Sequence, residues 1–300
     1  MLGHDGFDVT PNLLFQCLTA VGSKRVRFKQ VPDAFWNAAH IAPAWERTQR
    51  AFRVIVKFLE RFGVLTNAIL PSDAVLITLA AFFDKFPDAS RDPVMAWMLQ
   101  ALRYGRYSAA STTFLGEDLR DIENAPSARD AISSLLKRIR DIQSVSADEF
   151  LRDYGDSRFG RLMLFLLVFN RGAIDWDASG DRIAFEGTEL ERGFAPQFHH
   201  VFPRNFLVNK APLEQIEALA NIAIIGPRAN IRINDQDPLA YFSKYKICSE
   251  KRRQQFIEDD VESMVPENFP IWIGKRAQSL ADATNGYLSK LTQTSAATPS

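Results

Sequence analysis

The sequence predicts a mainly α-helical protein, in which a long helical part precedes a small α+β region closed by further helices. Through most of residues 11–170, apolar residues recur at three- and four-residue spacing, the pattern of helices with one buried face. After residue 170 this pattern breaks, and two short apolar runs near Gly and Pro residues read as strands. Helical signals return at Asp237. The order of helices, strands and helices indicates two domains.

Six helices are predicted in the first part, each from apolar spacing, most with a start or stop residue as well. Thr10 is a plausible N-cap, Gly63 is placed as a C-cap, and Ser72 and Asp92 mark further helix starts. The predicted helices are Pro11–Val21, Pro43–Phe62, Ser72–Phe86, Pro93–Tyr104, Asp130–Ile142 and Arg158–Asn170.

The last of these helices differs from the others. Arg158–Asn170 is apolar nearly all round, so we expect it at the centre of the core. Between the helices, Gly105, Gly116 and residues 124–126 read as loops.

The region after residue 170 is predicted to combine two short strands with several helices. Ile183–Phe185 reads as a strand leading to a pair of histidines, and Ile222–Gly226 reads as a second strand. Ala229–Ile233 is expected to begin a helix or form a tight loop. Later helices are expected at Asp237–Tyr245, Ser249–Glu258 and Ile271–Leu291. The resulting domains are residues 1–187, residues 188–291 and a small polar tail, residues 292–300, that we expect to be disordered.

Charge and composition exclude several classes of protein. The 300 residues include 36 Lys and Arg and 36 Asp and Glu, so a whole-chain basic signature of nucleic-acid binding is absent, although a local patch could still bind. The basic run Lys24–Lys29 is short and is interpreted as a solvated turn. Cys17 and Cys248 indicate neither a disulfide framework nor a zinc knuckle. Without a signal peptide or an apolar run of roughly 18 to 20 residues, a cytoplasmic protein with no membrane partner is expected.

The residues with catalytic potential lie between residues 198 and 241. This stretch holds two of the four histidines, His199 and His200, followed later by Asn221 and Asn230. Histidine is the commonest base near neutral pH, because its unperturbed pKa is about 6.5. Neighbouring strand residues face opposite sides, so the two rings diverge unless the backbone turns after them. Taken alone, the pair favours a buried, hydrogen-bonded turn.

The whole stretch resembles the ββα-metal finger of HNH nucleases, in the version at the C-terminal end of GmrSD-type restriction endonucleases. The matching residues are His199-His200-Val201-Phe202-Pro203, then Asn221 in LANIAII, Asn230 in RANIRIND, and Asp237-Pro238-Leu239-Ala240-Tyr241. The resemblance implies a helical domain followed by a small α+β HNH ββα-metal finger that C-terminal helices close. The helical part, with its RYGRYS turn, also resembles the region preceding the finger in that family.

The resemblance implies a role for each of the four polar side chains. His200 would take a proton from the attacking water, and His199 and Asn230 would bind a divalent metal, Mg²⁺ or Mn²⁺. Asn221 would hold the loop between the strands and orient the base. Cations around the finger could contact DNA phosphates, and the alternative is that they are ordinary solvated surface charges. These cations are Arg204, Lys210, Arg228 and Arg232.

The sequence therefore predicts a metal-dependent endonuclease that hydrolyses DNA phosphodiester bonds, in the restriction of foreign or modified phage DNA. The alternative is a catalytically silent nucleic-acid-binding or assembly module of a larger restriction system. GmrSD-type proteins usually begin with a nucleotide-hydrolysing domain related to ParB, for which this chain has no counterpart. We therefore expect the chain to be the C-terminal half of a longer protein or to work with a separate subunit. A homo-oligomer is a further expectation.

Overall fold

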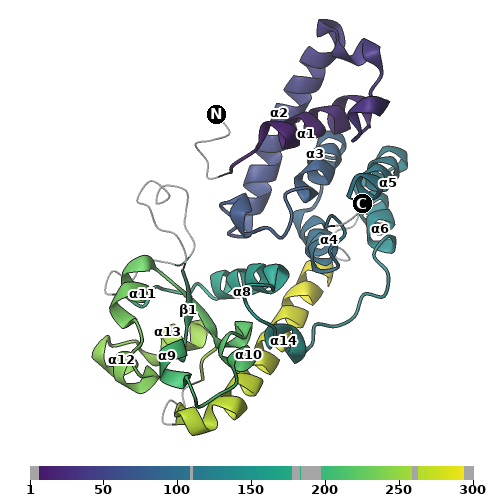
Figure 1. The fold of residues 1–300 in the computed structure, drawn as a ribbon. Coiled ribbons are helices and arrows are strands. Elements are labelled where there is room, and N and C mark those ends of the chain that lie inside the picture. The colour runs from purple at the N-terminus through teal and green to yellow at the C-terminus, as the bar shows by residue number, and fades with distance from the viewer. Residues whose placement is uncertain (1–6, 109–110, 178–182, 184–196, 259–262, 294–300) are drawn as a thin grey trace. The chain divides into compact units, whose positions relative to one another are not determined.

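The structure is a computed structural model of the chain, and it describes residues 7–108, 111–177, 183, 197–258 and 263–293. It is mainly helical, with 65% helix and a small two-stranded antiparallel sheet in the C-terminal region, so the predicted fold class is confirmed (Figure 1). The chain forms two compact units, residues 1–143 with 288–300 and residues 144–287. Among the described residues, the first unit consists of helices and their connections, and the sheet lies in the second.

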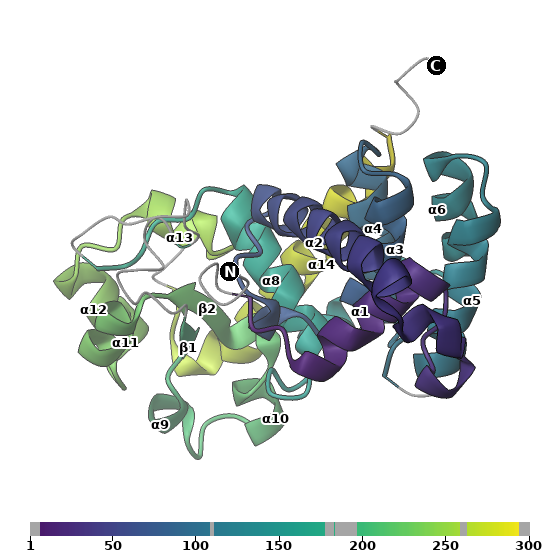
Figure 2. The same cartoon turned by 90° about the horizontal axis from the view of Figure 1, so that it is seen from above.

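The first unit is built from α1 to α6 together with the last residues of α14, the helix Phe269–Gln293. α3 contacts α1, α2 and α5, and α6 contacts α4 and α5, as Figure 2 also shows for α5 and α6. Its core contains large aromatic side chains, including Phe58 of α2, Phe82 and Phe83 of α3, and Trp97 of α4. The helices are α1 Pro11–Ser23, α2 Ala38–Arg61, α3 Val75–Lys85, α4 Arg91–Arg103, α5 Ser111–Asn124 and α6 Ala128–Lys137.

Capping side chains determine where the first two helices begin. The Thr10 hydroxyl accepts a hydrogen bond from the Leu13 amide at 3.3 Å, so the predicted cap of α1 is confirmed. At α2 the Asn37 side chain accepts from the His40 amide at 3.3 Å, and the helix begins earlier than predicted. Pro43, the expected first residue, therefore lies inside α2. The cap at Asn37 was the stronger start signal.

Three further helices also begin at other residues than predicted. α3 begins after the predicted cap Ser72 and has no side-chain cap hydrogen bond. α4 begins before the predicted Pro93. α6 begins after Ser127, whose hydroxyl accepts from the Asp130 amide at 3.2 Å, and it ends before Ile142.

Among the described helices that sequence reasoning missed, α5 is the longest, and it was missed because Gly116 and residues 124–126 read as loops. Gly116 lies inside the helix, and a Cβ at this position would meet no atom within 4 Å. Leu115, Leu119 and Ile122 are buried along one face of α5. Burial of three apolar side chains outweighs the cost of a helical glycine, which is about 1 kcal/mol relative to alanine.

The second unit holds one helix that was predicted residue for residue. α8 spans Arg158–Asn170, and its residues from Leu162 to Val168 are all buried, as expected for a helix within a core. The predicted start at Asp237 is also confirmed, because its carboxylate accepts from two amides at the beginning of α12. The remaining helices are α7 Ala147–Phe150, α9 Arg204–Leu207, α10 Leu213–Ile216, α11 Pro227–Ile233, α12 Pro238–Lys244, α13 Ser249–Gln254 and α14 Phe269–Gln293.

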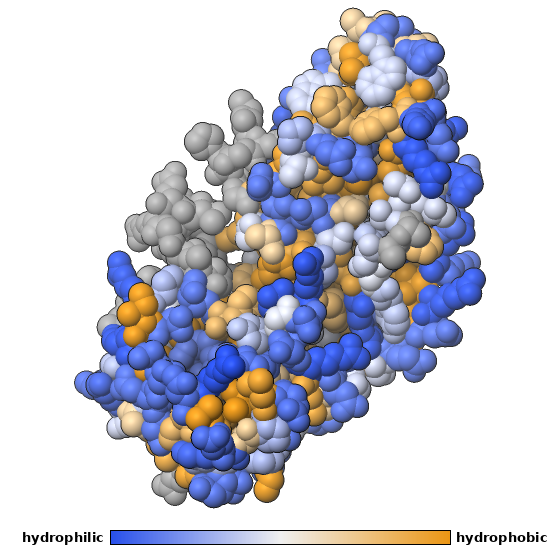
Figure 3. Space-filling model, in the orientation of Figure 1, coloured by the Kyte–Doolittle hydropathy of each residue, from blue (hydrophilic) through white to orange (hydrophobic). Residues whose placement is uncertain are grey.

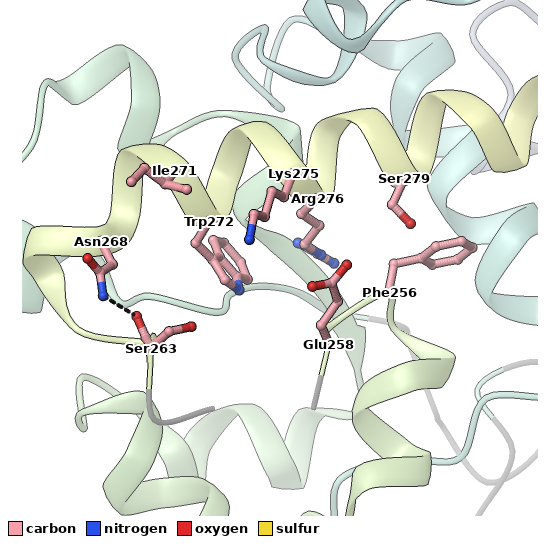
Figure 4. Close-up of a pocket in the computed structure, with 9 residues that line it drawn as sticks. All are labelled: Phe256, Glu258, Ser263, Asn268, Ile271, Trp272, Lys275, Arg276 and Ser279. Atoms are coloured by element: carbon pink, nitrogen blue, oxygen red, sulfur yellow. Dashed lines mark hydrogen bonds between the residues drawn. The ribbon is translucent and has the colours of Figure 1, made fainter. Parts of the chain in front are cut away.

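The sheet pairs β1, Gln197–His200, with β2, Ile222–Ile225, in antiparallel register. β2 is wholly buried, and the Gln255 side chain bonds to both backbone groups of Ile224, at 3.1 and 2.6 Å. Arg276 of α14 donates to the carbonyls of Ala220 and Ile222, at 2.5 and 2.7 Å. Figure 4 shows Arg276 extending from α14 beside a hollow. β2 is therefore held by side chains as well as by its partner strand.

The division into units differs from the predicted domains. The predicted boundary at residue 187 lies in the range 184–196, outside the described residues, and falls within the second unit. Of the strand predicted at Ile183–Phe185, only Ile183 is described, as a bend. α8, assigned to the first domain, belongs to the second unit, where the Tyr154 amide before it donates to the Glu217 carbonyl at 2.9 Å.

The last helix, α14, overlaps the start of the predicted tail. The predicted tail begins at residue 292, but α14 extends to Gln293, and residues 294–300 lie outside the described residues. In the described part of the chain, no helix is long and apolar enough to cross a membrane. On the face in Figure 3, hydrophilic residues cover most of the described surface, with hydrophobic residues in scattered patches.

Candidate active site

β1, β2 and α11 bring the predicted residues together in a ββα arrangement. The Val201 amide donates to the Asn221 carbonyl at 2.7 Å, which joins the two ends of the connection between the strands. β2 is an apolar run rich in isoleucine, a residue that favours strands. Pro227 then begins α11, because its restricted φ suits the first helical position. α11 contacts β1, so one short segment supplies both strands and the helix of the site.

His199 faces α11 and is only 5% exposed. Its Nδ1 donates to Asn230 Oδ1 at 2.8 Å, and its ring lies edge-on to Trp176 and Tyr241, with centroids 6.1 Å away in each case. Burial lowers the pKa of His199 to about 4, although the hydrogen bond to Asn230 opposes this shift. The imidazole is therefore neutral at pH 7, the form in which histidine binds metals.

His199 and Asn230 suit a divalent cation as a pair of ligands. His199 Nδ1 and Asn230 Oδ1 are 2.8 Å apart, so an ion shared by the two side chains would take the place of their hydrogen bond, and the ring proton would move to Nε2, which is buried and has no hydrogen-bond partner among the described residues. Imidazole nitrogen and amide oxygen both serve as metal ligands. No group of three or more His, Cys, Asp and Glu side chains in the described ranges could hold a metal. A cation held by this pair would keep several waters, as Mg²⁺ usually does.

His200 is the next residue of β1 and makes a separate set of contacts. Its Nε2 donates to Glu217 Oε2 at 3.1 Å, and the Tyr154 ring lies edge-on to the imidazole, with centroids 5.4 Å apart. The other carboxylate oxygen of Glu217 lies 3.4 Å from Arg204 Nε. Glu217 therefore holds the proton on Nε2, which leaves the lone pair of Nδ1 able to accept one.

Asn221 is completely buried in the connection between the strands. Its Oδ1 accepts from the Phe202 amide at 3.0 Å, and its Nδ2 donates to the carbonyls of Phe202 and Ile216, at 3.0 and 2.9 Å. Tyr241, in the DPLAY segment, donates its hydroxyl to the Val201 carbonyl at 2.7 Å. Asn221 thus closes the loop, while its effect on the orientation of the base stays a prediction.

The three arginines expected to contact DNA have different surroundings. Arg204 forms the ion pair with Glu217 described above. Arg232 donates through Nη2 to the Trp176 carbonyl at 3.2 Å. Arg228 is exposed and has no hydrogen-bond or ion-pair partner among the described residues. Of the three, Arg228 is therefore the one whose guanidinium needs no rearrangement to bind a phosphate.

Sequence reasoning missed three residues of this site. Glu217 lies in the connection between the strands, and a carboxylate shortly before Asn221 was the available signal. Asp175 and Trp176 lie before the first predicted strand, in a segment without predicted functional residues. Asp175 Oδ1 accepts from the Gly226 amide at 2.8 Å, and the Trp176 ring packs against His199. Neither contact has a signal in local sequence spacing, since both join residues far apart in the chain.

His199 is expected to make the free energy of unfolding depend on pH between about 6.5 and about 4. The unfolded chain binds more protons in this range, because the pKa of this histidine is higher there. Stability is therefore complete above pH 6.5 and falls as the pH drops towards 4, by up to about 3 kcal/mol. Urea unfolding in EDTA at pH 7 and pH 5 measures the loss, which should be smaller in His199→Gln. The control is His40→Gln, in which the loss of stability should equal that of the wild type. An equal loss in His199→Gln would contradict the assignment of this pH dependence to His199.

Comparison with known proteins identifies no family. No protein-family model matches the chain. Over 200 residues it is 22% identical to "Uncharacterized protein MJ0686" of Methanocaldococcus jannaschii. The aligned region covers 66% of this chain and 32% of the archaeal protein, so the chain spans about a third of the length of this relative.

Proposed function

We propose that this chain carries an HNH-type nuclease site that hydrolyses DNA phosphodiester bonds with Mg²⁺ or Mn²⁺, in the restriction of foreign or modified DNA. The observation that supports it most is the composition of the short segment from β1 to α11. Within it, His199 lies 2.8 Å from Asn230, and the adjacent His200 has a carboxylate partner at 3.1 Å. His199 and Asn230 would supply two ligands for a cation, and His200, the next residue of β1, would supply the base for metal-assisted hydrolysis.

In this proposal His200 is the general base. Glu217 accepts the hydrogen bond from Nε2, so the lone pair of Nδ1 is available to take a proton from water. The carboxylate also stabilises the imidazolium that forms when the proton arrives. Arg204 Nε lies 3.4 Å from the other oxygen of Glu217 and adds an ion pair there. Glu217 is therefore a positioning residue for the base.

His199 and Asn230 would hold the cation. A bound Mg²⁺ or Mn²⁺ would neutralise negative charge that develops on the phosphate in the transition state. Trp176 and Tyr241 pack against the His199 ring and fix its orientation. Burial among these rings also keeps His199 unprotonated, and therefore able to bind a cation, well below neutral pH.

The test of the proposal is metal-dependent cleavage. The purified chain, alone and with a candidate nucleotide-hydrolysing partner, is incubated with modified and unmodified DNA in Mg²⁺ or Mn²⁺. We expect cleavage that EDTA abolishes. In Asn230→Ala, the cleavage rate and the affinity for Mn²⁺ should both fall. Ile231→Ala is the control, because this neighbouring side chain on α11 is 80% exposed. Intact DNA under all these conditions would refute the enzyme, and binding without cleavage would favour the silent module.

A further inference from the structure

The balanced charge of the whole chain conceals an unequal division between the two units. Residues 1–143 with 288–300 contain more Lys and Arg than Asp and Glu, whereas residues 144–287 contain fewer. The net charge of zero is therefore a sum of opposite charges. The excess positive charge of the first unit favours the binding of a polyanion there.

The basic turn after α1, interpreted from sequence as solvated charge, lines a hollow of about 530 Å³. Lys24, Arg25 and Arg27 line it from the turn, and Arg120 lines it from α5. Arg27 donates to the Thr112 hydroxyl at 3.3 Å. Arg25 and Arg120 are exposed and have no ion-pair partner among the described residues. Their positive charges are therefore available to an anion.

α2 contributes a second row of cations, along another hollow of about 480 Å³. Arg50, Arg53 and Lys57 recur at intervals of three or four residues, so they are about one helical turn, or 5.4 Å, apart along one side of the helix. All three are exposed, and none has an ion-pair partner in the described part of the chain.

Asp84 of α3 interacts with one cation from each hollow. Its carboxylate pairs with Arg47, which lines the hollow beside α2, and lies 3.6 Å from Lys24, which lines the hollow beside α5. Among the described residues that line either hollow, Asp84 is the only carboxylate. One negative charge shared by two cations leaves the combined surface positive.

Several cations near the candidate active site are engaged. Arg204 pairs with Glu217, and Arg232 donates to the Trp176 carbonyl. Arg276 is buried and donates to backbone carbonyls, including that of Ala220. The side chains of Arg228 and Lys210 are exposed and form no hydrogen bond or ion pair with the described residues, so these two stay free near the finger.

We propose that the two hollows of the first unit form one basic track that binds the phosphodiester backbone of a nucleic acid. The track is defined by Lys24, Arg25, Arg27 and Arg120 together with Arg47, Arg50, Arg53 and Lys57. It supplies affinity for the substrate in addition to that of the free cations near the finger. This inference rests on the proposed function, because it assigns the substrate-binding surface of the same reaction.

The chemistry of the track favours a phosphodiester chain over other anions. A series of guanidinium groups matches phosphates, which they bind through two parallel hydrogen bonds. Repetition along a helix suits a ligand with regularly repeated charge. Contacts of this kind carry no sequence information, so binding is expected to be independent of base sequence. DNA and RNA share this backbone chemistry.

The test measures binding in EDTA, where no metal-dependent cleavage occurs. Fluorescence anisotropy is recorded with a DNA duplex and an RNA duplex of equal length, and flotation with phosphatidylserine vesicles. The track variants are Arg53→Gln/Lys57→Gln, Arg25→Gln/Arg120→Gln and their combination. The control, Lys137→Gln/Arg140→Gln, also removes one Lys and one Arg that are exposed and have no partner among the described residues of the first unit.

We expect each track pair to weaken nucleic-acid binding at least 10-fold at low salt and the control pair to change it less than 2-fold, order-of-magnitude figures for the removal of phosphate-binding cations. The slope of log affinity against log salt should become shallower by about 0.9 for each phosphate that a variant no longer neutralises. Stronger binding of the DNA or the RNA duplex identifies the natural backbone. Equal losses of affinity in track and control variants, or binding to vesicles alone, would overturn the proposal.

Failure of this inference differs from failure of the proposed function. If the track variants bind as the wild type does while His200→Ala abolishes cleavage, the track is wrong and the nuclease stands. If binding depends on the track but no metal supports cleavage, the nuclease is wrong and the track stands as a nucleic-acid-binding surface.

Discussion

His200→Ala is expected to lower the rate of metal-dependent DNA hydrolysis by about 10²- to 10⁴-fold, the usual contribution of a general base. Alanine cannot accept a proton, and no other histidine in the described ranges contacts Glu217. The fold should survive, because the imidazole is on the partly exposed side of the sheet and makes one polar contact.

Rates under single-turnover conditions with saturating DNA and Mn²⁺ measure this loss. Mn²⁺ affinity and DNA affinity should stay close to the wild-type values, because the cation is assigned to His199 and Asn230. The matched control is His40→Ala, which removes an exposed histidine from α2 in the first unit. Wild-type cleavage rates in His200→Ala would show that the base is another residue.

Asn221→Ala is expected to lower the free energy of unfolding of the second unit by about 3 kcal/mol or more. The change leaves the Phe202 amide and the carbonyls of Phe202 and Ile216 without their partners. All of these hydrogen bonds are buried, so water cannot replace the missing amide without entering the core. Release of the loop between the strands should also weaken the pairing of β1 with β2.

Urea unfolding followed by intrinsic fluorescence measures this effect. Asn205→Ala is the matched control, since this asparagine lies in the same connection but its one hydrogen bond, to Asp235, is exposed. Its stability should stay within about 0.5 kcal/mol of the wild type, as for most surface substitutions. Similar small effects in both variants would mean that Asn221 does not hold the loop.

Local sequence was sufficient where one short segment contains its own signals. α8 follows from an apolar pattern, and its predicted bounds are those observed. The start of α12 follows from Asp237, whose side chain caps it. Within residues 198–241, spacing and resemblance selected His199 and Asn230, which are in direct contact in the fold. Nucleic-acid contact and catalysis by this segment stay predictions.

Sequence by itself thus determined the helical class, the position of β2 and four polar side chains of the candidate site. Only the tertiary structure decided that α5 is a helix despite Gly116, and that α8 belongs to the same unit as the two strands. It also paired Glu217 with His200 and placed Lys24 and Arg47 beside Asp84. These features depend on burial and on charges from distant segments. Contacts between distant segments produce no periodic pattern in the amino-acid sequence.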